Sequence, residues 1–243
     1  MSFIVFLMKC FNMNLSELLK CFSKDEVAAA VFNYKSSFFK LHPARPDLTL
    51  AMAENTNMPQ EMQFAIDCLP AIQKLLSNKN RTDIVEFLDF GPGFGAGANL
   101  FATLYKSDFL QCRLIVDALD HKDLRKELAD VYFPLVNYIV GDINSVQDDK
   151  NWDIIYCSNV LEHLDNPKLL IDILRKKCRE WLVIYVPYKE SPLSPGHLVS
   201  LDETVFQDYN PIHVEVKSSV AWQPAYCAEK KQLLVILPGM ASK

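Results

Sequence analysis

The sequence predicts an α/β fold with a doubly wound, mostly parallel sheet, and two observations carry this prediction. From residue 84 onward, short apolar runs rich in β-branched and aromatic residues alternate with stretches of helical spacing. Four of the seven glycines follow the first of these runs directly, at positions 91, 93, 95 and 97. Alternating strands and helices give parallel strands covered on both faces, and a glycine-rich turn after a strand is typical of their ligand sites.

Seven strands are expected from the apolar runs, with four helical segments among them. The strands are placed at residues 84–90, 113–119, 138–140, 153–157, 181–186, 212–220 and 232–237. The helices are placed at residues 96–106, 121–131 and 166–178, with a short one at 202–208. The chain therefore holds enough strands for one sheet in a single α/β domain.

The residues before this pattern are expected to form a helical cap. Residues 14–40 look helical, and a second helix is expected over residues 59–76, where Met62, Ala65, Ile66 and Leu69 have helical spacing and Pro70 predicts a kink. We therefore expect two units, an N-terminal helical cap or lid at residues 1–80 and a ligand-binding domain at residues 81–243.

The composition narrows the class of protein. Twenty-five basic residues face 30 acidic ones, giving a net charge of −5, which disfavours a nucleic-acid partner. The seven cysteines include no C-x-x-C pair, which disfavours both a disulfide framework and a zinc site. The apolar start at residues 2–8 is too short to cross a bilayer and lacks the basic stretch of a secretory signal. We expect a cytoplasmic protein without a membrane partner.

The glycine turn fits two kinds of cofactor. Gly91, Gly93 and Ala96 satisfy the G-x-G-x-x-A pattern of dinucleotide sites. The stretch from Asp89 to Gly95 also reads D-x-G-x-G-x-G, which resembles the first motif of class I S-adenosylmethionine (SAM) dependent methyltransferases. A carboxylate at the strand end suits the ammonium group of SAM and would repel the pyrophosphate of a dinucleotide.

The resemblance to these methyltransferases covers about residues 84–240. Its most specific part is the stretch from Trp152 to Pro167, which contains Val160-Leu161-Glu162-His163-Leu164 and resembles the fourth-strand motif of small-molecule enzymes of the quinone-biosynthesis and sugar-modifying type. The resemblance implies a Rossmann-like, seven-stranded sheet whose last strand is antiparallel. The cofactor-binding residues that it implies are Asp89, Gly91, Gly93, Gly95, Asp120, Asp142, Ile143 and Asn159.

The same resemblance implies a role for each acidic residue. Asp89 would hold the methionine end of SAM, Asp120 the ribose hydroxyls and Asp142 the adenine amino group, with Ile143 packed on the ring. Asp117 competes with Asp120 for the ribose, and Asp120 could serve as a helix N-cap as well.

Three residues are candidates for the acceptor side. His163 could act as a general base, or it could brace the segment after the fourth strand together with Glu162. His197 and Tyr188 follow the fifth strand, where a loop of this family commonly closes over the acceptor. Glu162, His163 and His197 resemble part of the metal set of RNA-end 2′-O-methyltransferases, but Asn159 replaces the first glutamate, and we expect no metal.

The sequence thus predicts a SAM-dependent methyltransferase that transfers a methyl group directly to a hydroxyl or amine of a small molecule or glycan. Three alternatives remain at this stage. They are a nicotinamide-dependent oxidoreductase, for which no catalytic Tyr/Lys set is visible, a non-catalytic partner-binding module of the same fold, and an RNA-end 2′-O-methyltransferase, which would depend on a metal.

Overall fold

The computed structural model describes residues 58–106, 112–121, 132–146, 150–219 and 230–241, together with Lys126, Ala129 and Asp130. The helical stretch expected at residues 14–40 lies outside these residues, as does most of the helix expected at residues 121–131. Among the described helices, none combines the length and the apolar character needed to cross a membrane.

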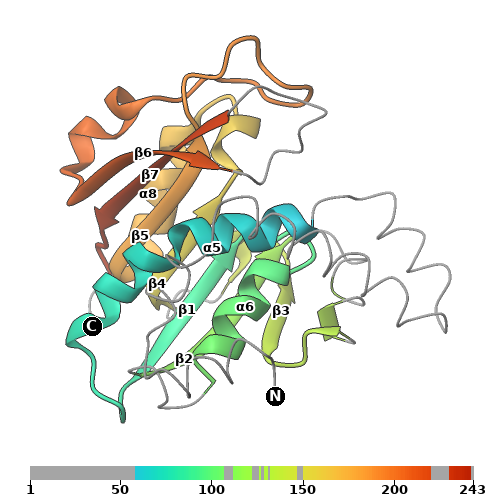
Figure 1. Ribbon diagram of the computed structural model, residues 1–243, viewed down its shortest axis with the longest axis vertical. Helices are drawn as coiled ribbons and strands as arrows, with labels where there is room; N and C mark the ends of the chain where they lie inside the picture. Colours follow the sequence, from blue (N-terminus) through green and yellow to red (C-terminus); the bar gives the residue numbers. More distant parts are fainter. Residues whose placement is uncertain are drawn as a thin grey trace, which may run out of the picture.

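A seven-stranded sheet in the order β3-β2-β1-β4-β5-β7-β6 forms the centre of the molecule (Figure 1). Strands β3, β2, β1, β4 and β5 are parallel to one another, whereas β7 runs antiparallel to both β5 and β6. The prediction of a doubly wound α/β sheet with an antiparallel last strand is confirmed. The strands are Ile84–Phe90 (β1), Arg113–Asp120 (β2), Val136–Val140 (β3), Trp152–Ser158 (β4), Cys178–Pro187 (β5), His213–Ser219 (β6) and Lys230–Pro238 (β7).

The described residues also include three α-helices and four short 3₁₀ helices. The α-helices are Met58–Leu75 (α5), Ala96–Leu104 (α6) and Pro167–Lys177 (α8). The 3₁₀ helices are Leu76–Asn78 (η1), Ile143–Ser145 (η2), Leu161–His163 (η3) and Glu203–Tyr209 (η4). The helix expected at residues 202–208 is therefore η4, and its first turn is capped by Asp202, whose carboxylate accepts the backbone N–H of Thr204 at 2.9 Å.

Two apolar cores cover the two faces of the sheet. Alternation along β1 sends Phe87 into one core with α5 and α6, and Leu88 into the other with α8 and η4. Both side chains are fully buried. A two-faced core of this kind is the expected consequence of strands that are apolar on both sides.

Helix α5 packs directly on α6 and on the sheet (Figure 1). Its buried residues recur at helical spacing, and they are Phe64, Ala65, Cys68, Leu69 and Ile72. Gly97 permits the close approach of the two helices, because a Cβ there would lie 3.0 Å from the backbone oxygen of Glu61. The division of the chain at residue 80 remains a prediction, and α5, on the expected cap side, shares its core with α6 and the sheet.

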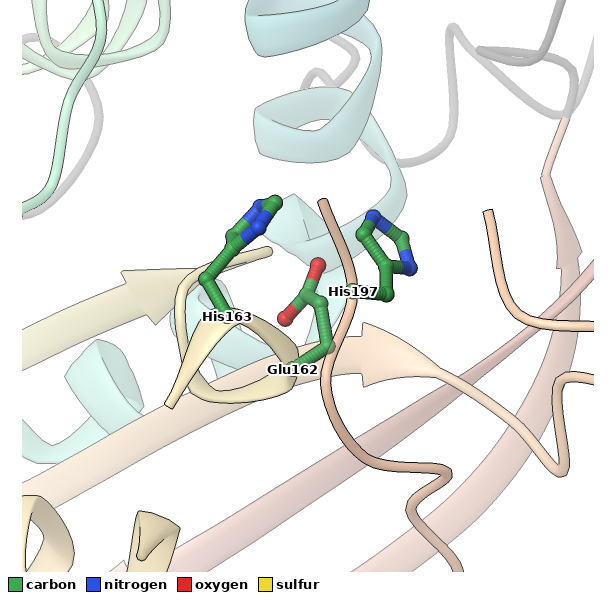
Figure 2. A group of neighbouring side chains, drawn as sticks. All are labelled: Glu162, His163 and His197. Carbon is green, nitrogen blue, oxygen red and sulfur yellow. The ribbon is translucent and has the colours of Figure 1, made fainter. Parts of the chain in front are cut away.

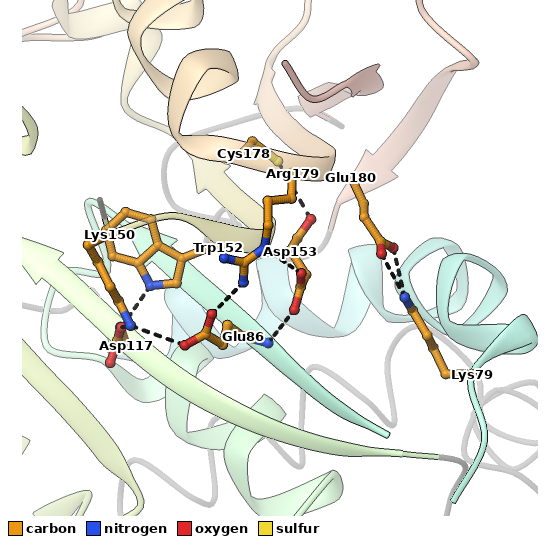
Figure 3. A network of polar contacts seen from close by, with 9 residues as sticks. All are labelled: Lys79, Glu86, Asp117, Lys150, Trp152, Asp153, Cys178, Arg179 and Glu180. Atoms are coloured by element: carbon orange, nitrogen blue, oxygen red, sulfur yellow. Dashed lines mark hydrogen bonds and ion pairs between the residues drawn. The ribbon is translucent and has the colours of Figure 1, made fainter. Parts of the chain in front are cut away.

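A polar network joins β1, β2, β4 and β5 away from the carboxyl ends of the strands (Figure 3). Arg179 pairs with Glu86 and, at 2.7 Å, with Asp153. Asp117 accepts the indole N–H of Trp152 at 2.7 Å and pairs with Lys150 at 3.1 Å. Buried polar groups need such partners, so this network accounts for Asp117 as a structural residue.

Candidate functional site

A cavity of about 950 Å³ opens where the carboxyl ends of the parallel strands meet. This edge is where open α/β sheets bind their ligands, and the volume suits a cofactor with an acceptor. Most of the predicted site residues line the cavity, namely Asp89, Gly91, Gly93, Asp120, Asp142, Ile143, Asn159, His163 and His197. Gly95 and Tyr188 do not line it.

The glycine turn between β1 and α6 needs glycine for two reasons. Gly91, Gly93 and Gly95 all have positive φ, at 70°, 63° and 89°, a region that other residues enter at a cost. A Cβ on Gly91 would lie 2.4 Å from Cγ2 of Val160, and a Cβ on Gly93 would lie 1.9 Å from Oε1 of Glu61. These two glycines therefore make room for side chains of the protein itself, in addition to any ligand.

We expect Gly91→Ala to destabilise the fold by about 1–3 kcal/mol more than Gly95→Ala, because of overpacking. Both substitutions place a side chain at positive φ, but the nearest atoms to a Cβ on Gly95 are 3.7 Å away. The difference thus isolates the overlap with Val160. Urea unfolding of the two variants measures the difference between their free energies of unfolding. Equal losses of stability would mean that the Val160 side chain does not obstruct a Cβ at position 91.

Glu61 on α5 binds the glycine turn and was not predicted from the sequence. Its carboxylate accepts the backbone N–H groups of Phe94 at 2.9 Å and Ala96 at 3.1 Å. Ala96 begins α6, so a carboxylate of the chain occupies the helix N-terminus, where an anionic ligand would otherwise bind. No sequence motif around Glu61 predicts this contact, because the contact depends on how α5 packs against the sheet.

Acidic side chains from two strand ends meet in the cavity. Asp89 is the penultimate residue of β1 and is buried, and burial together with the charges of Glu61 and Asp120 raises its pKa well above the usual value. Asp120 ends β2, is 5% exposed, and lies 3.1 Å from Nδ1 of His121. Three carboxylates so arranged favour a ligand that carries positive charge.

Asp117 and Asp120, the two acidic residues of β2, have different surroundings in the structure. Asp120 lines the cavity, whereas Asp117 is absent from its lining and bonds instead to Trp152, Lys150 and Asn137. Three positions of a strand separate the two residues, so their side chains lie on opposite faces of the sheet. Of the two, Asp120 is therefore the one able to reach a ligand.

The end of β3 supplies a third part of the cavity. Oδ1 of Asp142 accepts the backbone N–H of Asn144 at 2.7 Å and thereby caps η2. Its side chain is exposed, while Ile143 beside it is buried at 3% exposure. The pair thus offers a polar acceptor next to an apolar surface, as a flat heteroaromatic ring would require.

Asn159 follows β4 in a left-handed conformation, with φ of 52°. Its backbone N–H donates to the backbone carbonyl oxygen of Tyr185 at 2.8 Å, and its Nδ2 donates to Oγ of Ser158 at 3.1 Å. The chain then enters η3, whose residues Glu162 and His163 line the cavity.

Glu162, His163 and His197 converge at one side of the cavity (Figure 2). The two rings meet edge to face with centroids 4.8 Å apart, and the Glu162 carboxyl lies between them. Glu162 is 1% exposed, and neither carboxyl oxygen has a hydrogen-bond partner among the described residues. Burial, with a contribution from the charge of Glu190, raises the pKa of Glu162 to about 8.

The donor atoms of these three residues lie within 4.8 Å of one another, a spacing that could accommodate a metal ion. Asn159, which stands where the related metal set has a glutamate, contributes an amide instead of a carboxylate. The expectation that no metal is used remains a prediction.

Tyr188 is not brought to the site. Its hydroxyl donates to Oε1 of Glu203 at 3.4 Å, and its backbone forms a β-bridge with Leu201. A different residue of the same loop, Glu190, binds Nδ1 of His197 instead. The sequence contains no signal for this pairing, because seven positions of irregular loop separate the two residues.

Comparisons with known proteins bear on the family and the fold of this chain. Residues 88–180, from β1 into β5, match a family model described as a methyltransferase domain. The chain is similar to the ubiquinone biosynthesis O-methyltransferase of Rickettsia felis, at 32% identity over 104 residues. That match covers 41% of this chain and 39% of the relative, so the chain spans well under half of the curated protein.

Solved structures share the fold at low sequence identity. Magnesium protoporphyrin IX methyltransferase from Synechocystis PCC 6803, solved with bound S-adenosylhomocysteine (SAH), has a TM-score of 0.53 and 13% identity, covering 76% of this chain and 86% of that one. The [4+2]-cyclase SpnF has a TM-score of 0.54 and 12% identity, covering 71% of this chain and 81% of that one. The two neighbours have different chemistry, so the fold alone does not specify the reaction.

Proposed function

We propose that this chain binds SAM and methylates a hydroxyl group of a small molecule, since residues 88–180 match a family model described as a methyltransferase domain. The observation that carries the proposal is the charge of the cavity at the glycine turn. Burial raises the pKa of Asp89, and the nearby charges of Glu61 and Asp120 raise it further. SAM brings an ammonium and a sulfonium to such a site, and either cation would relieve the repulsion.

The position of Glu61 argues against a dinucleotide. The pyrophosphate of a nicotinamide cofactor normally binds the N–H groups at the start of the helix that follows the glycine turn. Here those of Phe94 and Ala96 already donate to Glu61. A pyrophosphate would have to displace Glu61 and then lie beside the carboxyl group of Asp89.

Each part of SAM has a fitting group in the cavity. Asp89 would hold the ammonium, and Asp120 would accept the two ribose hydroxyls. Asp142 would accept the adenine amino group, while Ile143 would pack on the ring. When bound, SAM supplies an electrophilic methyl group on a good leaving group, so the protein needs chiefly to align an acceptor with it.

The acceptor is inferred from the polar side of the cavity. His163 and His197 lie there, and a histidine can remove the proton that a hydroxyl must lose. The similarity to an enzyme named as an O-methyltransferase supports an oxygen acceptor on a small molecule. An amine or a glycan acceptor is the broader form of the proposal, and RNA-end methylation is the alternative that would require a metal.

Calorimetric titration of the purified chain with SAM, SAH and NAD⁺ tests the cofactor. We expect SAM and SAH to bind with micromolar dissociation constants and NAD⁺ to give no heat of binding. Binding of NAD⁺ would favour the oxidoreductase. If none of the three ligands binds, a module that binds a partner without catalysis would be favoured.

A further inference from the structure

The loop after β5 brings His197 to the cavity and holds it there. The backbone N–H groups of Leu198 and Val199 both donate to the backbone carbonyl oxygen of Glu162, at 2.7 and 3.3 Å. Nδ1 of His163 lies 2.8 Å from the oxygen of Gly196, in the same loop. These contacts attach the loop to η3, and the His197 side chain is only 7% exposed.

Glu190 determines how the His197 ring is oriented. Oε2 of Glu190 binds Nδ1 of His197, and Oε1 accepts from Oγ of Ser194 and, at 3.1 Å, from Nζ of Lys230. The Glu190 side chain is 7% exposed. These three partners hold the pKa of Glu190 down, to about 2, although burial opposes them. An ionised carboxylate can only accept, so Nδ1 of His197 carries the hydrogen and Nε2 of the neutral ring has its lone pair.

The two histidines of the cavity differ in what supports them. Nδ1 of His163 faces a backbone carbonyl, which also makes it the donor, but a carbonyl carries no net charge. His197 is supported by a carboxylate, which stabilises the imidazolium that forms when the ring takes a proton. His163 is also exposed, whereas the His197 side chain is buried. The arrangement therefore favours His197 over His163 as the proton acceptor.

We propose that His197 is the general base for the acceptor hydroxyl and that Glu190 is its positioning residue. The inference rests on the proposed methyl transfer and makes it specific to oxygen acceptors that lose a proton. Nε2 of His197 takes the hydroxyl proton as the oxygen forms its bond to the methyl carbon, while the carbon–sulfur bond breaks and its electron pair stays on sulfur. The imidazolium then returns its proton to water, so charge and atoms balance.

The variant Glu190→Gln tests the orientation without removing the side chain. Lys230 can only donate, so the amide oxygen should take the place of Oε1. The amide NH₂ would then face Nδ1 of His197 and donate to it. We expect His197 to change from the Nδ1–H to the Nε2–H tautomer. Nε2 would then carry a hydrogen and have no lone pair with which to accept the hydroxyl proton.

The ¹⁵N chemical shifts of the histidine side chains report this tautomer in the folded chain with bound SAH. His163 provides an internal control, since its carbonyl partner is unchanged and it should stay Nδ1–H. Glu203→Gln is the matched variant, because Glu203 is a carboxylate of the same region whose partners are Tyr188 and Lys189. It should leave both rings as they are.

A kinetic measurement tests whether the tautomer of His197 affects the rate of methyl transfer. With catechol as the probe acceptor, we expect Glu190→Gln to lower kcat at least about 100-fold, with an unchanged dissociation constant for SAH. Glu203→Gln should retain the wild-type rate.

Three results would overturn the proposal. One is an Nε2–H tautomer of His197 in the wild type, and another is no change of tautomer in Glu190→Gln. The third is a shift of both Nε2 signals on adding micromolar Zn²⁺, with activity lost in chelator, which would make these nitrogens metal ligands. Failure of the wild type to bind SAH would instead reject the proposed function, and the tautomers of His197 would then be measured in the chain without SAH.

Discussion

Replacing Asp120 by alanine is expected to weaken the binding of SAM and SAH by about 10²- to 10³-fold. Asp120 lies at the carboxyl end of β2 in the cavity, and it is 5% exposed. A carboxylate there can accept both ribose hydroxyls, and hydrogen bonds to a charged group contribute about 1.5–3 kcal/mol each. The effect should be nearly equal for SAM and SAH, because the two share the ribose. Calorimetric titration measures both constants.

Asp117→Asn is the matched control on the same strand. It should lower the free energy of unfolding by about 2–3 kcal/mol. The substitution disturbs the contacts of Asp117 to Trp152 and Lys150 (Figure 3) and its contact to Asn137. Its affinity for SAH should stay within about twofold of the wild type. Loss of SAH binding in Asp117→Asn, with normal binding in Asp120→Ala, would reverse the assignment of the ribose site.

The second large effect is a loss of stability with rising pH that depends on Glu162. Its pKa is about 8 in the fold, against an ordinary value of 4.5, so the folded state holds the proton more tightly than the unfolded chain. Stability is therefore highest below pH 4.5 as far as this group is concerned, and it falls as the pH rises towards 8. At about 1.4 kcal/mol per pH unit, the loss approaches about 4 kcal/mol across that window.

Glu162→Gln should remove this dependence, since an amide does not titrate. We expect urea unfolding at pH 5, 6, 7 and 8 to show wild-type stability falling relative to the variant. Glu215→Gln, at an exposed position on β6, should follow the wild-type curve. Parallel curves for wild type and Glu162→Gln would mean that Glu162 is ionised in the fold, as it would be if it held a cation.

Much of the fold could be predicted because its signals are local. The apolar runs predicted all seven strands, the helical spacing predicted α6, α8 and η4, and the glycine turn predicted the edge of the sheet that forms the cavity. Boundaries were less accurate where a tertiary partner extends an element. Strand β5 begins at Cys178, directly after α8, and not at Trp181, because Cys178 pairs with Trp152 of the neighbouring strand.

The sequence by itself placed Asp89, Asp120 and Asp142 at strand ends, because parallel strands bring their carboxyl ends to one edge whatever the packing around them. Only the tertiary structure placed Asp117 outside the lining of the cavity, brought Glu61 onto the glycine turn and paired Glu190 with His197. Those contacts join α5 to a turn, and two parts of an irregular loop to each other. No periodicity encodes them, since they depend on how separate elements pack and on where a buried polar group finds its partner.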